Sequence, residues 1–299
     1  MEKRSFGKTG MELSVLGFGG AEIGFDSVAA SDVAHLLGAA LDAGLNVIDT
    51  AECYGSEGSI GEAVAHRRDD FFLFTKCGHA SGFSEPDWDI AMLEKSIDRS
   101  LSLLKTDCID LVQLHSCSED LLRQGDVIAV LQRARDAGKT RFIGYSGDSK
   151  AALYAIQCGA FDSLQTSVNI ADQECIDLTL PEAAKAGMGV IAKRPIANVA
   201  WRYGTNPPEN NYHKSYWERL GKLDYRFLRP GSDAEAVSIA LRFTLAQTAV
   251  TTAIVGTTKP DRWKSNAALL DAGPLAPDQI QAIRDRWHAI AGTDWVGQG

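Results

Sequence analysis

The chain has 299 residues, a formal net charge of −9 and a sequence pI of about 5.2. Hydrophobic residues make up 45% of it and charged residues 23%, which is the composition of a globular protein rather than of a disordered chain. So acidic a chain is a poor candidate for binding to nucleic acid or to an anionic membrane, because both require a basic surface. No apolar window is long enough to cross a membrane, and no secretory signal follows the charged N-terminus.

The cysteines indicate a reducing environment. The chain has 6 of them, none in a C-x-x-C pair, and most lie in apolar strand-like or helical segments, where a thiol packs as a small hydrophobic group. We therefore expect free thiols, no disulfide framework and a cytoplasmic location. The sequence gives no indication of the oligomeric state.

Short apolar runs alternate with helical patterns along the whole chain. The predicted strands cover residues 14–20, 46–51, 70–78, 108–116, 141–147, 163–169, 189–196 and 251–256. The first helix is predicted over 31–43, with Ser31 as its N-cap and Gly44 as its stop, and the last over 276–291. Residues 119–138 are predicted to form one helix, and 197–230 a polar, aromatic-rich loop. The apolar runs are typical of parallel strands that are buried on both faces.

Eight strands, each followed by a helix, predict an α/β fold of the (β/α)8, or TIM barrel, type as one domain over residues 1–299. The first dozen residues, with a Lys-Thr-Gly turn, are expected to form a β-hairpin that closes the bottom of the barrel. An open, doubly wound sheet is the alternative, because it has the same strand–helix rhythm. Its Gly-x-Gly-x-x-Gly loop is absent here: Gly17 and Gly19 are followed by Glu22, whose carboxylate would repel a pyrophosphate.

Ionisable residues stand where three consecutive predicted strands end. Asp49, Lys76 and His115 each follow an apolar run, and Tyr54 comes in the loop just after Asp49. In a barrel the carboxyl ends of the strands form one rim, where active sites lie. We therefore expect these four side chains to meet, whereas each of them alone would read as a capping, ion-pairing or packing residue.

The four residue types suit proton transfer to a developing alkoxide. Tyrosine has an ordinary pKa of about 10, too high for easy proton exchange at neutral pH. A nearby lysine cation would lower the pKa of the tyrosine, and a carboxylate would keep that lysine charged. A histidine would hold the substrate oxygen by a hydrogen bond. No metal is expected, because the 6 histidines show no ligand spacing and His115 with Cys117 would supply only two ligands.

These residues stand in motifs that resemble those of the aldo-keto reductases. GKTGMELSVLGFGG (7–20) resembles the opening hairpin and first strand of that family, and AGLNVIDTAECYGS (43–56) resembles its most specific motif. The resemblance covers nearly the whole chain and implies a catalytic tetrad of Asp49, Tyr54, Lys76 and His115. It implies NAD(P)H-dependent reduction of an aldehyde or ketone, in which the nicotinamide gives hydride and Tyr54 gives the proton.

The resemblance also implies cofactor contacts. The matching positions are Gly20, Ser146, Gln165, Lys193, Arg194, Gly256, Thr257, Thr258, Arg262 and Asn266. Ser146 and Gln165 match the partners of the nicotinamide carboxamide, while Gly147 replaces an asparagine of many members. Lys193 and Arg194 replace an aromatic residue that stacks on the nicotinamide. These two cations would contact the pyrophosphate or stack on a ring, and a surface ion pair is the alternative.

Cofactor preference depends on the segment IVGTTKPDRWKSN (254–266). Lys259, Arg262 and Lys264 would meet the extra phosphate of NADP(H), and a helix beginning near Pro260 would point amide donors at it. Arg262 matches the family's phosphate-binding arginine, but Gly256 replaces a lysine of many NADP-dependent members. We expect NADP(H) rather than NAD(H), with a merely solvated helix face as the alternative.

Two other functions are weighed against this one. A non-catalytic, nicotinamide-binding regulatory subunit would share the fold, but the complete tetrad argues against it. A metal-dependent hydrolase or isomerase would need several ligands at the strand ends, where only Asp49 and His115 stand. The expected partner is a small carbonyl compound, whose identity the sequence does not reveal.

Overall fold

Eight short parallel strands form a closed barrel in the computed structural model, which describes residues 1–229, 231, 233–259 and 262–298. The strands are β3 (Leu16–Gly19), β4 (Val47–Asp49), β5 (Phe72–Cys77), β6 (Ile109–His115), β7 (Thr140–Ser146), β8 (Ser163–Ser167), β9 (Gly189–Lys193) and β10 (Thr252–Gly256). Each pairs with the next in chain order, and β10 pairs with β3, which closes the ring. The predicted (β/α)8 barrel is therefore confirmed, and the doubly wound alternative is wrong.

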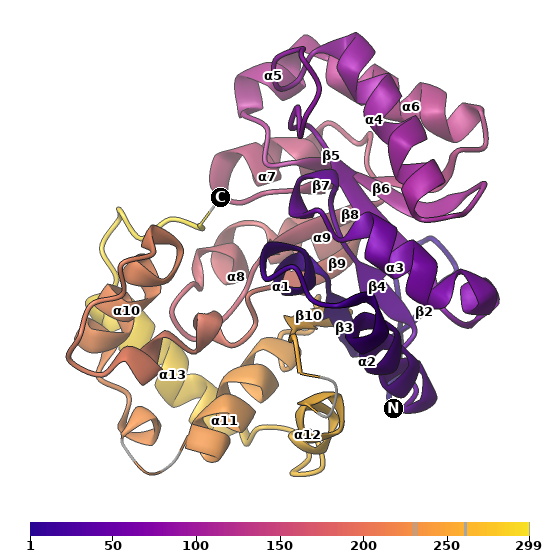
Figure 1. The fold of residues 1–299 in the computed structure, drawn as a ribbon. Helices are drawn as coiled ribbons and strands as arrows, with labels where there is room; N and C mark the ends of the chain where they lie inside the picture. The colour runs from indigo at the N-terminus through magenta and orange to yellow at the C-terminus, as the bar shows by residue number, and fades with distance from the viewer. Residues whose placement is uncertain (230, 232, 260–261, 299) are drawn as a thin grey trace.

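Helices surround this barrel (Figure 1). They are α1 (Ala21–Phe25), α2 (Ala30–Asp42), α3 (Glu57–Val64), α4 (Ile90–Leu103), α5 (Glu119–Gln124), α6 (Asp126–Asp136), α7 (Ser149–Gln157), α8 (Glu174–Leu178), α9 (Leu180–Ala186), α10 (Asn211–Leu223), α11 (Asp233–Leu245), α12 (Arg262–Ala268) and α13 (Pro277–Ile290). Four short 3-10 helices lie in the connections of the described chain: η1 (Glu52–Tyr54), η2 (Ala65–Asp70), η3 (Ala197–Tyr203) and η4 (Arg226–Leu228). Among the described residues, no helix has the length and apolar character needed to span a bilayer.

Helix α4 shows how the outer helices attach to the barrel. Asp89 caps its start, because the carboxylate accepts a hydrogen bond from the backbone N–H of Met92 at 2.9 Å. Met92, Leu93 and Ile97 are buried along one face and share a core cluster with Val112 of β6. Burial of that apolar face holds the helix against the sheet.

The N-terminal hairpin closes the bottom of the barrel, as predicted. β1 (Lys3–Ser5) and β2 (Glu12–Ser14) pair in antiparallel orientation. Their apolar side chains form one buried cluster with residues of the barrel strands: Phe6, Met11, Leu13, Val47, Phe74, Leu111 and Ile191. Gly189 leaves room for this cluster, since a Cβ there would lie 2.3 Å from a ring carbon of Phe6.

Two helix boundaries differ from the prediction. Helix α2 begins at Ala30 with Ala29 at its N-cap, so Ser31 lies inside the first turn instead of capping it. The single helix predicted over 119–138 is two helices, because Gly125 takes a left-handed φ of 84° between α5 and α6. An isolated glycine is also tolerated inside a helix, so the sequence did not reveal the break.

The loop predicted over 197–230 is wrong, because this segment contains α10 and two 3-10 helices. Asn210 caps α10 by accepting a hydrogen bond from the backbone N–H of Tyr212 at 2.8 Å. Tyr216, Leu220 and Leu223 are buried at the spacing of one helix face. Charged and aromatic residues surround these three positions in the sequence and hid their periodicity.

We expect Phe6→Ala to lower the free energy of unfolding by about 3–5 kcal/mol, because it removes a fully buried ring and leaves a cavity in the barrel floor. Phe25→Ala is the matched control: Phe25 is 66% exposed, so its loss should change stability by less than about 0.5 kcal/mol. Urea denaturation measures both values. Equal losses for the two variants would contradict a hairpin that plugs the barrel.

Candidate active site

Three neighbouring strands bring the predicted tetrad to one rim of the barrel. Asp49 is the last residue of β4, Lys76 lies one residue before the end of β5, and His115 is the last residue of β6. Tyr54 ends the 3-10 helix η1, which follows β4 after two residues. Because parallel strands end on the same side of a barrel, the four side chains meet at the carboxyl rim.

Asp49 and Lys76 form a buried ion pair. The Lys76 Nζ lies 2.6 Å from Asp49 Oδ2 and also donates to the Thr50 carbonyl oxygen at 2.8 Å. The two side chains are only 1% and 2% exposed. Burial raises the pKa of Asp49, and the Lys76 ammonium works against that shift, as do the amides of Gln113 and Gln165. The lysine is thereby held in one place beneath the rim.

Tyr54 lies beside this pair. Its ring centroid is 5.2 Å from Lys76 Nζ and 5.6 Å from the centroid of the His115 ring. We expected Lys76 to lower the pKa of this tyrosine, but burial, together with the negative charge of Asp49, raises the pKa of Tyr54 well above its usual range. The phenol is therefore fully protonated at neutral pH, which is the form that donates a proton.

His115 is held as a neutral imidazole. Burial lowers its pKa well below the usual range, and the positive charge of Lys76 adds to the effect. Its Nδ1 lies 3.5 Å from the sulfur of Cys53, and its ring centroid lies 5.1 Å from that of His79. The histidine thus has one nitrogen facing a thiol and a second imidazole beside it.

Two predicted cofactor residues lie next to each other on the inner rim. Ser146 ends β7 and pairs in register with Gln165 of β8, and both are 1% exposed. The Gln165 amide accepts a hydrogen bond from Gln113 at 2.9 Å and donates to Asp49 at 3.3 Å. Gln165 therefore connects the predicted carboxamide position to the ion pair of the tetrad.

Lys193 and Arg194 have separate protein partners. Lys193 forms an ion pair with Asp148 at 2.9 Å, which is the alternative that we weighed, except that the pair is buried and not at the surface. The Arg194 guanidinium lies 4.4 Å from the ring centroid of Tyr212 on α10, and its Nε donates to that hydroxyl at 2.6 Å. Asp148 and Tyr212 were not predicted as site residues, and the aspartate in the run Gly-Tyr-Ser-Gly-Asp was the only signal.

Two glycines among the predicted cofactor positions, Gly20 and Gly256, lie at the ends of adjacent strands. Gly20 follows β3, and its N–H donates to the Asp49 carbonyl oxygen at 2.8 Å. Gly256 ends β10 opposite Gly19 of β3. Glu22 of α1 lies against Gly256, where a Cβ would overlap its carboxylate. A lysine at this position, as in many NADP-dependent members, would not fit beside that carboxylate without a shift of Glu22.

The residues predicted to bind the adenosine phosphate of the cofactor lie between the end of β10 and the first turns of α12. Thr257 and Thr258 are half-buried, Arg262 is exposed, and Asn266 is 8% exposed on the following turn. Pro260, which was predicted near the start of this helix, lies outside the described residues. The structure thus puts these predicted residues on one segment at the β10 side of the rim.

Comparison with known proteins agrees with this fold. The model described as "Aldo/keto reductase family" matches residues 15–287. L-galactose dehydrogenase of Arabidopsis thaliana is 30% identical, over 93% of this chain and 91% of its own. D-threo-aldose 1-dehydrogenase from a Pseudomonas species is 26% identical, over 86% and 89%. The solved structure of aldo-keto reductase AKR11C1 from Bacillus halodurans, in its holo form, has a TM-score of 0.81 at 25% identity and covers 99% of both chains.

This chain belongs to the aldo/keto reductase family. It is accordingly an oxidoreductase that reduces a carbonyl compound with a nicotinamide cofactor, as the sequence predicted. The relatives named above are named as dehydrogenases or reductases, and the match covers nearly their whole length. They give no support to the alternative of a regulatory subunit.

Glu52 is a buried carboxyl in the reductase that was not among the predicted site residues. Its side chain is 7% exposed, and one oxygen accepts a hydrogen bond from the backbone N–H of His79 at 2.9 Å. The other oxygen has no partner among the described residues. Burial raises the pKa of Glu52 to about 8. Its place in the AECYG motif, two residues before Tyr54, was the available signal.

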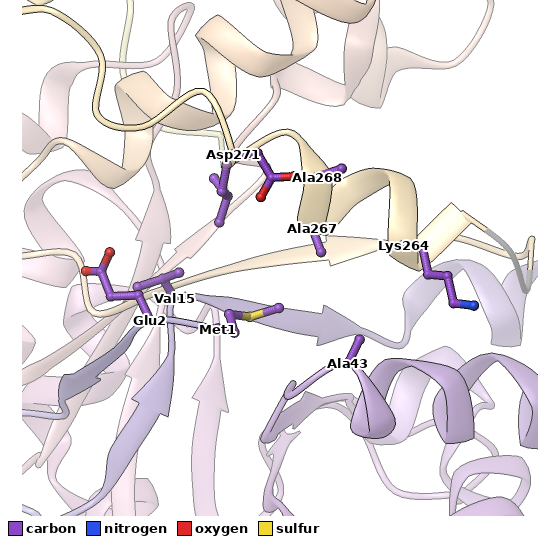
Figure 2. Close-up of a pocket in the computed structure, with 9 residues that line it drawn as sticks. Met1, Glu2, Val15, Ala43, Lys264, Ala267, Ala268 and Asp271 are labelled. Atoms are coloured by element: carbon purple, nitrogen blue, oxygen red, sulfur yellow. The ribbon is translucent and has the colours of Figure 1, made fainter.

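A cavity of about 490 Å³ lies away from the rim of the reductase (Figure 2). Its lining residues are Met1, Glu2, Val15, Ala43, Lys264, Ala267, Ala268, Leu270 and Asp271. Val15 precedes β3 and Ala43 follows α2, so the cavity opens at the amino ends of the strands. Barrel active sites lie at the opposite ends, and we assign this cavity no part in catalysis.

The pKa of Glu52 makes the stability of the reductase depend on pH. Because the folded state binds this proton more tightly than the unfolded chain, the group stabilises the fold below pH 4.5, and its contribution is lost as the pH rises to about 8. We expect the free energy of unfolding of the wild type, relative to Glu52→Gln, to fall between these values. Urea titrations across this range measure it.

Glu62→Gln removes an exposed carboxylate, 62% accessible, and is the control for general effects of pH. Its free energy of unfolding should follow that of the wild type at every pH. Parallel curves for the wild type and Glu52→Gln would contradict a buried Glu52 that holds its proton.

Proposed function

We propose that this reductase transfers hydride from NADPH to the carbonyl carbon of a small aldehyde or ketone, and that Tyr54 delivers the proton to the oxygen. The buried Asp49–Lys76 ion pair beside the Tyr54 ring is the observation that carries the proposal. Burying two charges costs desolvation energy, so such a pair next to a phenol requires a reason. Stabilising a developing phenolate supplies that reason.

The residues at the rim fit a nicotinamide dinucleotide by their chemistry. The Ser146 hydroxyl and the Gln165 amide, side by side at two strand ends, suit a carboxamide. Thr257, Thr258 and Arg262 suit a phosphate. When bound, the nicotinamide would supply the hydride. We therefore propose that the cofactor extends along the rim from the β7–β8 side to α12.

Tyr54 acts in this proposal as the proton donor, because burial keeps its phenol protonated. As the phenol gives up its proton, the ammonium of Lys76, 5.2 Å from the ring centroid, stabilises the negative charge left behind. Asp49 keeps Lys76 charged and fixed through their 2.6 Å contact. The proton therefore leaves Tyr54 only when a carbonyl oxygen becomes basic enough to take it.

His115 orients the carbonyl group in this proposal. The lowered pKa keeps its ring neutral, so it does not compete with Tyr54 as an acid. Because Nδ1 faces the Cys53 sulfur at 3.5 Å, Nε2 is the nitrogen left to donate a hydrogen bond to a carbonyl oxygen. That bond would align the oxygen for the proton of Tyr54.

Sugars are the first class of carbonyl compound to test. Two relatives are named for them, L-galactose dehydrogenase and D-threo-aldose 1-dehydrogenase. In this chain the ring of His79 lies beside that of His115, with centroids 5.1 Å apart, and the ring of Trp88 lies on His79, with centroids 5.9 Å apart. Histidine and tryptophan side chains have apolar faces and polar ring nitrogens. Both features suit a sugar, whose ring carries hydroxyl groups.

We expect Tyr54→Phe to lower kcat for an aldehyde or aldose by about 100- to 10,000-fold, because it removes the proton donor. Lys76→Met should cause a comparable loss. The double variant should be little worse than either single one, because the cation acts only through the phenol. Oxidation of NADPH followed by absorbance gives kcat, and quenching of tryptophan fluorescence gives cofactor affinity, which should not change in Tyr54→Phe.

Tyr154→Phe is the control, since this tyrosine lies on the outer helix α7. Its kcat should equal that of the wild type. Retention of more than about half the wild-type kcat by Tyr54→Phe would rule out Tyr54 as the general acid. A double variant whose loss equals the product of the two single losses would contradict the coupling.

Arg262 is the residue on which we base the preference for NADP(H). It is exposed at the start of α12, close in sequence to the hydroxyls of Thr257 and Thr258. A guanidinium binds a phosphate through paired hydrogen bonds, and NADP(H) differs from NAD(H) by one phosphate. An exposed guanidinium at this end of the rim would therefore favour the phosphorylated cofactor.

We expect Arg262→Ala to weaken NADPH binding about ten- to a hundredfold and to leave NADH binding nearly unchanged, since one charge-assisted contact is worth about 1.5–3 kcal/mol. Lys185→Ala is the matched control, because Lys185 is an exposed cation at the end of α9, the helix that precedes β9. Fluorescence titration with both cofactors measures the affinities. Equal losses for the two cofactors in Arg262→Ala, or tighter binding of NADH by the unmutated chain, would count against this preference.

A further inference from the structure

Two histidines and a cysteine meet at the rim beside Tyr54. The ligand atoms of Cys53, His79 and His115 all lie within 4.8 Å of one another. Cysteine sulfur and histidine nitrogen are ligands that Zn²⁺ prefers. We propose that these three residues form a Zn²⁺ site and that its occupation reversibly switches the reductase off.

The spacing of the cluster is close to that of a tetrahedral site. With Zn–S of about 2.3 Å and Zn–N of about 2.0–2.1 Å, a sulfur and a nitrogen ligand stand about 3.6 Å apart. Cys53 Sγ and His115 Nδ1 are 3.5 Å apart. The His79 ring lies beside that of His115, with centroids 5.1 Å apart. Three protein ligands leave a fourth position for water, as in sites where the metal stays accessible.

His79 also has the support that a metal-binding histidine usually has. Its Nδ1 lies 2.9 Å from Asp87 Oδ2, and Asp87 Oδ1 accepts a hydrogen bond from the backbone N–H of Ala80 at 2.8 Å. Metal-bound histidines commonly give their second ring N–H to a carboxylate, which fixes the ring and its tautomer. In His79 this contact leaves Nε2 as the nitrogen for a ligand.

The charges around the cluster allow a cation. Lys76 and Lys193, two cations near His115, are each paired with a buried aspartate, Asp49 and Asp148, which offsets part of their positive charge. Glu52, the neighbour of Cys53 in the chain, has a buried carboxyl with one oxygen unpartnered among the described residues. Zinc binds cysteine as the thiolate, so binding releases the proton of the Cys53 thiol.

Loss of activity follows from the position of the site, and this part rests on the proposed function. A metal on Nδ1 of His115 changes the ring that would hold the carbonyl oxygen, and its water ligand would compete with the substrate. A dication near Tyr54 also favours the phenolate, which has no proton to give. Occupied sites would therefore not turn over.

Co²⁺ is the probe for binding, because a cobalt–thiolate bond and tetrahedral cobalt each give characteristic absorption bands. We expect the full chain to show both bands and Zn²⁺ to abolish them by displacement. Cys53→Ser should lose the thiolate band, and His79→Gln should bind at least about tenfold more weakly. Cys158→Ser removes an exposed thiol and should leave the bands unchanged.

A wild-type chain without the thiolate band would overturn the site. Persistence of that band in Cys53→Ser, or its loss in Cys158→Ser, would overturn it as well. These measurements involve no turnover, so their outcome does not depend on whether Tyr54 is the proton donor.

Inhibition is measured with the same variants. Wild-type activity should be lost at the Zn²⁺ concentration that displaces Co²⁺ and should return with a chelator. In Cys53→Ser, rates with and without Zn²⁺ should be equal, whatever the basal rate of that variant. Zn²⁺ binding without loss of wild-type turnover, or equal inhibition of Cys53→Ser, would overturn the regulatory part of the proposal.

Discussion

The ion pair between Asp49 and Lys76 constrains the whole carboxyl rim of the barrel. Both side chains are almost fully buried, and loss of one partner would leave an uncompensated charge at a cost of about 3–5 kcal/mol. β4 and β5 must therefore end side by side. The amides of Gln113 and Gln165, from β6 and β8, reach Asp49 across the barrel and tie those strands to the same pair. The ring of Tyr54 lies next to the ammonium of Lys76, so the position of the ion pair also determines which charge faces the phenol.

Burial is the common cause of the electrostatics around that pair. It raises the pKa of Tyr54 and of Glu52 and lowers the pKa of His115, since a low dielectric disfavours the charged form of each group. The free reductase thus holds a neutral phenol and a neutral imidazole beside one ion pair. In the proposed reaction, negative charge appears on the phenol only when the substrate takes its proton. The fixed ammonium of Lys76 is then in position without any rearrangement.

The sequence predicted those parts of the site that the barrel itself determines. Asp49 and His115 each end an apolar run, and a closed parallel sheet brings such ends together, so their meeting followed from pattern and fold. Contacts between side chains from different loops, or from strands far apart in the chain, could not be predicted from the sequence pattern. The partner of Lys193 is Asp148, two strands away in the chain, and α10 places Tyr212 against Arg194 although its segment had no clear helical period. Local periodicity contains no information on which side chains from separate loops will touch.

The rate of hydride transfer in Asp49→Asn tests the central role of the ion pair most directly. This variant keeps the size of the side chain but removes the charge that holds Lys76. Stopped-flow mixing with NADPH and an aldehyde measures a single turnover, and circular dichroism establishes that the variant is folded. We predict a rate at least about 100-fold below that of the wild type, with unchanged affinity for NADPH. A folded Asp49→Asn that transfers hydride at the wild-type rate would contradict the account.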